Sequence, residues 1–176
     1  VSAYIPTNVI SITDGQIFLE SSLFFSGMRP AVNVGLSVSR VGGDAQTKAM
    51  KKAAGSLRID LAQYREMEVF TQFSSDLDDA TKEQLEYGGG LMELLKQPLG
   101  KPMSLAEKVI TLCAARHKVM LGIPTAKVKG FQMDMLSYFA SAHPEIAREI
   151  EETKDLSKEL SQKIVEIAEE FKKSRC

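Results

Sequence analysis

The sequence of 176 residues has only two cysteines, almost no net charge and no long hydrophobic run. Cys113 and Cys176 lie far apart, so they predict neither a metal-binding pair nor a disulfide framework, and we expect a reducing, cytosolic compartment. The sequence lacks the run of about 18 or more apolar residues that a membrane helix needs. Its net charge of −1 creates no global field for nucleic acid or an anionic membrane. We therefore expect no nucleic-acid partner and no direct insertion into a membrane.

Two further absences concern nucleotides and metals. The sequence has no G-x-x-x-x-G-K-[ST] loop, so it offers neither a backbone cradle nor a lysine for nucleotide phosphates. No aspartate follows a predicted strand at a position that we can assign to magnesium. His117 and His143 have no cysteine or carboxylate partners at the spacing of metal ligands, so we expect no metal site.

The composition changes near residue 44, and the part before it is rich in Val, Ile, Ser, Thr, Gly and Pro. We predict strands over residues 9–13, 16–19 and 31–38. A turn is predicted at Asp14-Gly15, and one helical turn, closed by Gly27, over residues 22–25. The low charge of these strands predicts that both faces of their sheet are buried, as in a parallel sheet covered by helices. Most partners of such a sheet would come from upstream sequence. Because the chain begins with Val1 rather than Met, we expect a fragment or a processed chain.

The part after residue 44 predicts an all-α bundle of about six helices. Asp44 is the expected cap of the first helix, and Asp78 or Asp79 the expected start of the third. Residues 88–90, all glycine, are expected to bend or break that helix, and Ser104 begins a capping box. Other predicted helices span residues 57–73, 125–142 and 156–171. A basic cluster that we interpret as a solvated helix face comprises Lys48, Lys51, Lys52 and Arg58.

Arg40 is the residue most able to carry chemistry, because it ends an extended Gly-, Ser- and Val-rich segment. The planar, permanently charged guanidinium matches phosphate oxygens in pairs. Taken alone, the residues favour a structural salt bridge at the end of a strand. Ser37, three residues earlier, has a hydroxyl that could steady the segment by bonding to nearby backbone, or it is an ordinary strand serine. Ser11, in a predicted strand, has no distinguishing feature of its own.

Five stretches of the sequence resemble the C-terminal part of the alpha subunit of bacterial F-type ATP synthase. They are YIPTNVISITDGQIFLE (residues 4–20), RPAVNVGLSVSRVGG (29–43), LAQYRE (61–66), SDLDDATKEQL (75–85) and ELLKQ (93–97). The resemblance implies a mainly α fold. Residues 1–45 would be the end of a RecA-like α/β nucleotide-binding domain, and residues 46–176 a C-terminal helical domain.

The resemblance also implies roles for particular residues. Arg40 matches an arginine finger that reaches the nucleotide on the neighbouring beta subunit, and Ser37 and Ser11 match serines of the same catalytic region. Residues that match the adenine pocket of alpha's own nucleotide are Phe24, Arg29, Pro30 and Gln97. The family often has a second glutamine two residues after Gln97, where this sequence has Leu99, so one adenine contact is not expected here.

At the level of the complex, the resemblance implies a regulatory, non-catalytic subunit of a proton-translocating ATP synthase. Its expected ligand is ATP or ADP with magnesium, in the intact complex. Its expected partners are beta subunits, the central stalk gamma subunit and the peripheral stalk. The expected location is peripheral, on the cytoplasmic side of the cell membrane. Two alternatives are a catalytic relative, such as a beta subunit, and a standalone helical interaction module made of residues 45–176.

We predict that the purified 176-residue chain neither holds ATP tightly nor hydrolyses it, because the sequence lacks the phosphate loop. Equilibrium dialysis with ATP and a phosphate-release assay measure the two properties. ATP turnover that stays with the chain through repeated purification would contradict the prediction.

Overall fold

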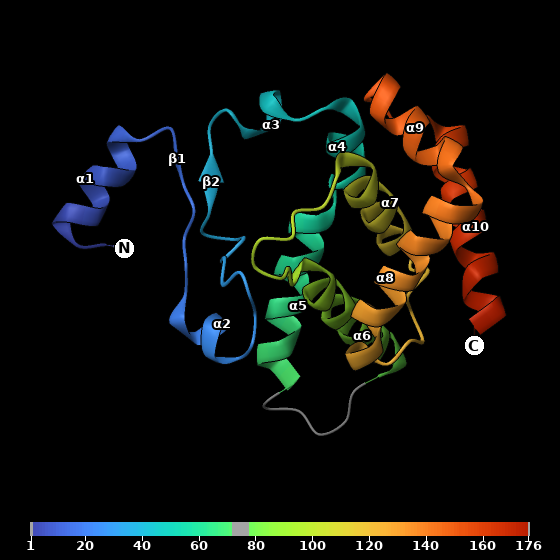
Figure 1. Cartoon of the computed structure of the whole chain (residues 1–176). Coiled ribbons are helices and arrows are strands. Elements are labelled where there is room, and N and C mark those ends of the chain that lie inside the picture. The colour runs from blue at the N-terminus through green and yellow to red at the C-terminus, as the bar shows by residue number, and fades with distance from the viewer. Residues whose placement is uncertain (1, 72–77, 176) are drawn as a thin grey trace. The chain divides into compact units, whose positions relative to one another are not determined.

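The computed structural model of the chain describes residues 2–71 and 78–175, with the side chains of residues 70 and 71 left aside (Figure 1). The chain divides into two compact units, Val1–Gln46 (unit 1) and Thr47–Cys176 (unit 2). Unit 1 contains short helices and one strand pair, whereas unit 2 is helical. The end of the predicted helix over residues 57–73 and the first part of the stretch at residues 75–85 lie outside the described residues.

Unit 1 begins with helix α1 (Tyr4–Ile12), so the predicted strand over residues 9–13 is wrong. The hydroxyl groups of this Thr-, Ser- and Ile-containing segment bond within the helix. Thr7 Oγ1 donates to the carbonyl of Ala3 (2.8 Å), and Ser11 Oγ donates to that of Asn8 (2.7 Å). This back-bonding gives the hydroxyls partners without favouring the helix, and Pro6 is tolerated because it lies in the first turn, where its missing N–H would have had no helical partner.

Strands β1 (Gly15–Gln16) and β2 (Val38–Ser39) form an antiparallel pair in unit 1, with Gly15 opposite Ser39. The expected parallel arrangement is absent from the described part of unit 1. The reason is that residues 17–37 fold back as one long hairpin, with a second bridge between Leu19 and Val32. Helix α2 (Ser21–Phe25) lies within this hairpin and is followed by Gly27 at φ 88°, which confirms the predicted helical turn and its glycine.

Gly15 permits the close approach of the two strands. A Cβ atom at this position would lie 2.4 Å from the carbonyl oxygen of Val38 and 2.9 Å from the Cα of Ser39. No side chain fits at these distances, so glycine is required by packing as well as by the predicted turn.

Unit 2 contains seven helices among its described residues, one more than predicted. They follow helix α3 of unit 1 (Gly42–Ala45). Their bounds are α4 (Lys48–Ala53), α5 (Leu57–Thr71), α6 (Asp79–Leu95), α7 (Leu105–Arg116), α8 (Thr125–Ala142), α9 (Pro144–Thr153) and α10 (Lys158–Arg175). The additional helix is α9. Its signals in the sequence are Pro144 at the first helical position and the buried pair Ile146 and Ile150, four residues apart.

Side chains cap four of these helices in the described part of the chain, and the cap of α10 is Ser157, whose Oγ accepts a hydrogen bond from the backbone N–H of Leu160 at 3.0 Å. Thr47, not Asp44, caps α4, because its Oγ1 accepts a hydrogen bond from the backbone N–H of Met50 at 3.2 Å. Asp78 caps α6 and so is the correct one of the two predicted starts. The capping box of Ser104 and Glu107 at the start of α7 is confirmed, since both of its hydrogen bonds are present.

Helix α7 is the centre of unit 2, where it contacts α4, α8, α9 and α10. Its side chains Val109, Cys113 and Ala114 are almost fully buried. The predicted apolar stripe of the last helix is confirmed. Its buried members are Leu156, Leu160, Ile164, Ile167 and Phe171. None of the helices in the described part of the chain is both long and apolar enough to cross a bilayer.

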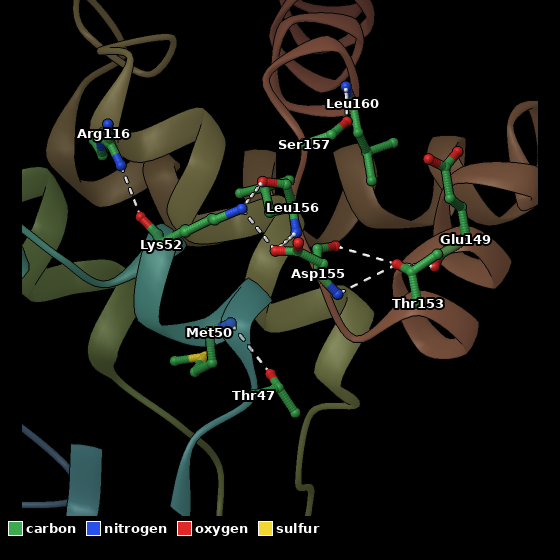
Figure 2. A network of polar contacts seen from close by, with 10 residues as sticks. All are labelled: Thr47, Met50, Lys52, Arg116, Glu149, Thr153, Asp155, Leu156, Ser157 and Leu160. Atoms are coloured by element: carbon green, nitrogen blue, oxygen red, sulfur yellow. Dashed lines mark hydrogen bonds and ion pairs between the residues drawn. The ribbon is translucent and has the colours of Figure 1, made fainter. Parts of the chain in front are cut away.

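A polar network joins α4 to the connection between α9 and α10 (Figure 2). The Nζ of Lys52 donates to Asp155 Oδ1 (2.7 Å) and to the carbonyl of Leu156 (3.0 Å). From α7, Arg116 donates to the carbonyl of Lys52 at 2.7 Å. The hydrogen bond from Lys52 is the main reason that the pKa of Asp155 lies below its ordinary value. Lys52 therefore links helices while it stays exposed, and because Lys48, Lys51 and Arg58 are exposed as well, the interpretation of the cluster as a solvated face is confirmed.

Helix α6 runs without a break through Gly88, Gly89 and Gly90, so the expected bend or break does not occur. At Gly88 helix α5 approaches α6 tightly. A Cβ atom on Gly88 would lie 2.3–2.5 Å from Cδ2, Cγ and Cβ of Tyr64. A rotamer change could move the Tyr64 ring atoms but not its Cβ, which is fixed to the backbone of α5 and would still lie 2.5 Å from the added atom. The glycine therefore serves helix packing.

We predict that Gly88→Ala destabilises the chain and that Gly90→Ala, two residues away, stabilises it. The methyl group at residue 88 would overpack against Tyr64, at a cost of about 1–3 kcal/mol. A Cβ at residue 90 meets no atom within 4 Å, so this change brings only the gain of up to about 1 kcal/mol from better helix propensity. Urea unfolding followed by circular dichroism measures both. Equal effects of the two substitutions would show that Gly88 has no packing role.

Candidate functional site

Arg40 lies directly after β2 and is exposed. Its backbone N–H donates to the carbonyl of Asp14 at 2.9 Å, which anchors the residue beside the start of β1. The guanidinium makes no hydrogen bond or ion pair with residues 2–71 and 78–175. The structural salt bridge that the isolated residues favoured is thus not found within that part of the chain. A charged, planar group on an anchored backbone is available to an external anion.

The Ser37 hydroxyl cross-links the two extended segments of the long hairpin. It donates to the carbonyl of Asn33 at 2.6 Å and accepts a hydrogen bond from the backbone N–H of Phe18 at 2.9 Å. The expectation that this hydroxyl bonds to nearby backbone is confirmed. Because Ser37 precedes Arg40 by three residues, the cross-link fixes the segment that leads to the guanidinium.

Asn33, which the sequence analysis missed, is the most connected residue of unit 1. Its side chain is buried, its Nδ2 donates to Glu20 Oε2 (2.9 Å), and its Oδ1 accepts from the backbone N–H of Leu36 (3.0 Å). Its own N–H donates to the carbonyl of Phe18 at 2.8 Å. The available signal was an asparagine in a Val-rich segment two residues before Gly35, since asparagine side chains often bond to the backbone of a turn.

Ser11 lies on α1, where its exposed hydroxyl bonds within its own helix. It makes no hydrogen bond with Arg40 in the described structure. The structure therefore joins Ser37 to the Arg40 segment and leaves Ser11 apart from both.

Phe24 and Arg29 are in contact. The Arg29 Cζ lies 4.5 Å from the centroid of the Phe24 ring, and the Phe25 ring meets the same ring edge-on at 5.7 Å. Pro30 follows Arg29 through a cis peptide bond. The Phe24 side chain is half exposed, so the pair presents a flat apolar ring and a delocalised cation together. Such a surface can stack with an aromatic heterocycle.

Gln97 belongs to unit 2, in the connection between α6 and α7. It is exposed, and its Nε2 donates to the carbonyl of Lys101 at 3.0 Å. Leu99, nearby in the same connection, is also exposed.

The described residues contain no group of three or more His, Cys, Asp or Glu side chains arranged to hold a metal ion. The two histidines have local roles. His143 Nδ1 lies 3.5 Å from Glu145 Oε1, and His117 Nδ1 lies 2.8 Å from the carbonyl of Cys113. The donor set for magnesium and the phosphate loop are thus not found in this part of the chain.

Two family models match the chain. The model described as ATP synthase alpha/beta chain, C terminal domain, matches residues 46–171. The model described as ATP synthase alpha/beta family, nucleotide-binding domain, matches residues 1–39. The second match contains Ser11, Phe24, Arg29, Pro30 and Ser37 and ends one residue before Arg40.

Curated relatives give the same result over nearly the whole chain. The chain is 57% identical to an ATP synthase subunit alpha of Clostridium kluyveri over 173 residues, which cover 98% of the chain. It is 54% identical to that of Petrotoga mobilis over 171 residues, or 97% of the chain. It is 57% identical to that of Acetivibrio thermocellus over 172 residues, or 98%. The chain spans about a third (34%) of the length of each of these relatives.

We predict that Ser37→Ala loosens the segment before Arg40, because it removes one hydrogen bond donated to Asn33 and one accepted from Phe18. A loss of about 1–2 kcal/mol in local stability raises the open population roughly five- to thirtyfold. Limited trypsin digestion of the 176-residue chain measures this as faster cleavage after Arg40.

The matched control is Ser39→Ala. Ser39 is exposed, and its hydroxyl makes no hydrogen bond to the described residues, so the cleavage rate should not change. Equal rates in the two variants would show that the Ser37 cross-link does not hold the segment.

Proposed function

This chain belongs to the ATP synthase alpha/beta family and matches the C-terminal part of its alpha subunits, and from that premise we propose that Arg40 is an arginine finger. In the intact complex the guanidinium would reach the catalytic site on the neighbouring beta subunit. There it would stabilise the negative charge that builds up on the phosphoryl group during transfer. Such a finger contributes about 10³–10⁵ in rate in the enzymes where it has been measured.

One observation supports this proposal above the others. The Arg40 backbone is anchored to Asp14 at 2.9 Å, while its guanidinium is exposed and has no partner among the described residues. An arginine finger that acts on a neighbouring subunit needs an anchored backbone and an unpaired guanidinium. The anchored backbone limits the conformational entropy lost when the side chain reaches the anion, and the unpaired guanidinium has no internal ion pair to break.

Ser37 has a positioning role in this proposal. Its only hydroxyl hydrogen is donated to the carbonyl of Asn33, and its oxygen also accepts from the N–H of Phe18, so Ser37 holds the segment and has no further proton to donate to a phosphate. Ser11 is assigned to the catalytic region by the resemblance alone, and its hydroxyl would have to leave the carbonyl of Asn8 to contact a phosphate.

We further propose that Phe24, Arg29, Pro30 and Gln97 contact the adenine of ATP or ADP bound to alpha itself. The contact between Phe24 and Arg29 supports a stacking surface in unit 1, and the role of Gln97 comes from the resemblance. The phosphates and the magnesium ion would be held by other parts of the intact protein, since this chain has no phosphate loop. Alpha's nucleotide would be regulatory and not turned over.

In this proposal residues 1–45 complete a nucleotide-binding domain and residues 46–176 form the C-terminal helical domain. Large apolar side chains exposed on unit 1 support a surface that packs on other protein. They include Tyr4, Ile5, Ile12, Ile17, Leu19 and Phe25. The partners would be beta subunits, the gamma subunit of the central stalk and the peripheral stalk. The assembly would carry out proton-translocating ATP synthesis or hydrolysis as a peripheral complex on the cytoplasmic side of the cell membrane.

We predict that Arg40→Ala in the full-length subunit leaves assembly with beta largely intact and lowers multisite ATP turnover by about three orders of magnitude or more. Arg40→Lys should rescue little, because an ammonium cannot match two phosphate oxygens in a plane. Gel filtration measures assembly, and steady-state ATP hydrolysis by the complex measures turnover.

Arg148→Ala is the control, because Arg148 is exposed on α9 and makes no ion pair with the described residues. Turnover should be unchanged in this variant. An assembled Arg40→Ala complex with full turnover would remove the finger role.

A further inference from the structure

Helix α8 holds one end of the connection that carries Gln97. The Nζ of Lys129, on the first turns of α8, donates to the carbonyl of Lys96 (2.5 Å) and lies 3.4 Å from that of Leu94. These carbonyls end α6, where a helix has no further backbone donors of its own. Lys129 therefore fixes the residue immediately before Gln97 from a different helix.

A neighbouring side chain of α8 holds the other end. Gln132 lies three residues after Lys129, hence on the same helix face. Its Nε2 lies 3.2 Å from Thr111 Oγ1 and 3.9 Å from the sulfur of Met103. The side chain is buried, and its Oε1 has no hydrogen-bond partner among the described residues. The two α8 side chains thus clamp residues 96 and 103, and the segment between them carries the proposed adenine contact.

Ending α6 with the Lys129 ammonium carries an energetic cost. Lys129 is half buried, and the loss of hydration lowers the pKa of its ammonium group. A solvated carbonyl end would avoid this cost, and Lys127, two residues earlier, stays exposed. A cation that is held in a partly dehydrated place to bond two carbonyls is typical of a segment whose exact position matters.

Within the clamped segment, the orientation of the Gln97 amide follows from its partner. The carbonyl of Lys101 can only accept a hydrogen bond, so the amide nitrogen of Gln97 must face it, at 3.0 Å. The turn that presents this carbonyl is closed by the Lys101 N–H to the carbonyl of Pro98 (3.3 Å) and contains Gly100 at φ 71°. The Gln97 Oε1 makes no hydrogen bond with the described residues and is left as an acceptor, and Gln97 is one of the residues that line a groove of about 360 Å³ in unit 2.

We propose that Lys129 is a positioning residue that, with the turn at residues 98–101, fixes the Gln97 Oε1 as an acceptor for the exocyclic amino group of adenine. This inference rests on the proposed adenine contact of Gln97. An acceptor in this place favours a 6-amino purine over a 6-oxo purine, because the second would set two acceptors against each other. Lys129 therefore contributes to base selectivity without touching the nucleotide.

The test compares ATP with ITP, which differ at position 6 of the purine, on the full-length alpha subunit. Dissociation constants for both are measured by equilibrium dialysis. We expect the unaltered subunit to prefer ATP about tenfold and Lys129→Met to lower this ratio about fivefold, the factor that one hydrogen bond is worth. Lys129→Arg should keep most of the ratio, and Lys127→Met should keep all of it.

Gly100→Val is a second route to the same result, because it strains the turn that presents the Lys101 carbonyl without altering the core. It should lower the ATP to ITP ratio as Lys129→Met does, even where Lys129→Met fails to fold. An unchanged ratio in Gly100→Val, or in a folded Lys129→Met, overturns the inference, provided that Gln97→Ala lowers the ratio. An unchanged ratio in Gln97→Ala shows instead that the proposed adenine contact is wrong, and the inference falls with it.

Discussion

The cross-link that the Ser37 hydroxyl makes between two extended segments is the constraint on which the candidate site depends. Strands β1 and β2 are only two residues long each, and a ladder so short is not stable by itself. Side chains supply the missing hydrogen bonds: Ser37 joins Phe18 to Asn33, and Asn33 reaches Glu20. These bonds are partly buried, so water competes with them weakly. As a result the segment before Arg40 is ordered, while the guanidinium stays exposed and unpaired among the described residues.

In unit 2, too, single residues determine how neighbouring elements pack against one another. Gly88 allows α5 to approach α6, because any side chain there would collide with Tyr64. Lysines then join elements that are distant in sequence. Lys52 connects α4 to the segment between α9 and α10, and Lys129 connects α8 to the end of α6. Long, flexible cationic side chains suit this task, because the stem packs along apolar surface while the ammonium reaches backbone carbonyls. The α6–α7 connection is thereby fixed at both ends by a rigid helix.

Much of the helical part could be predicted from the sequence, and less of the strand-rich part. Caps such as Ser104 and Asp78 and the apolar stripe of α10 are local patterns, and the structure has them where expected. α1 was missed because its Ile, Val and Thr residues have a high strand propensity that the structure does not follow. The packing role of Gly88 could not be predicted from its sequence neighbours, because Tyr64, the residue it packs against, lies on the separate helix α5. Arg40 and Ser37 stood out from the residues themselves, and the resemblance supplied the roles proposed for them. Asn33 and Lys129 did not stand out, because their importance comes from partners elsewhere in the chain.

The most direct test of the central claim is a structure of the intact complex with ADP and an aluminium fluoride mimic of the transferring phosphoryl group at the beta site. Our account predicts that the Arg40 guanidinium lies at charge-assisted hydrogen-bond distance from the fluoride ligands, about 2.7–2.9 Å. The segment over Asn33 and Ser37 should keep the hydrogen bonds seen here. Arg40 paired with a carboxylate of its own subunit, and turned away from the boundary with beta, would contradict the account.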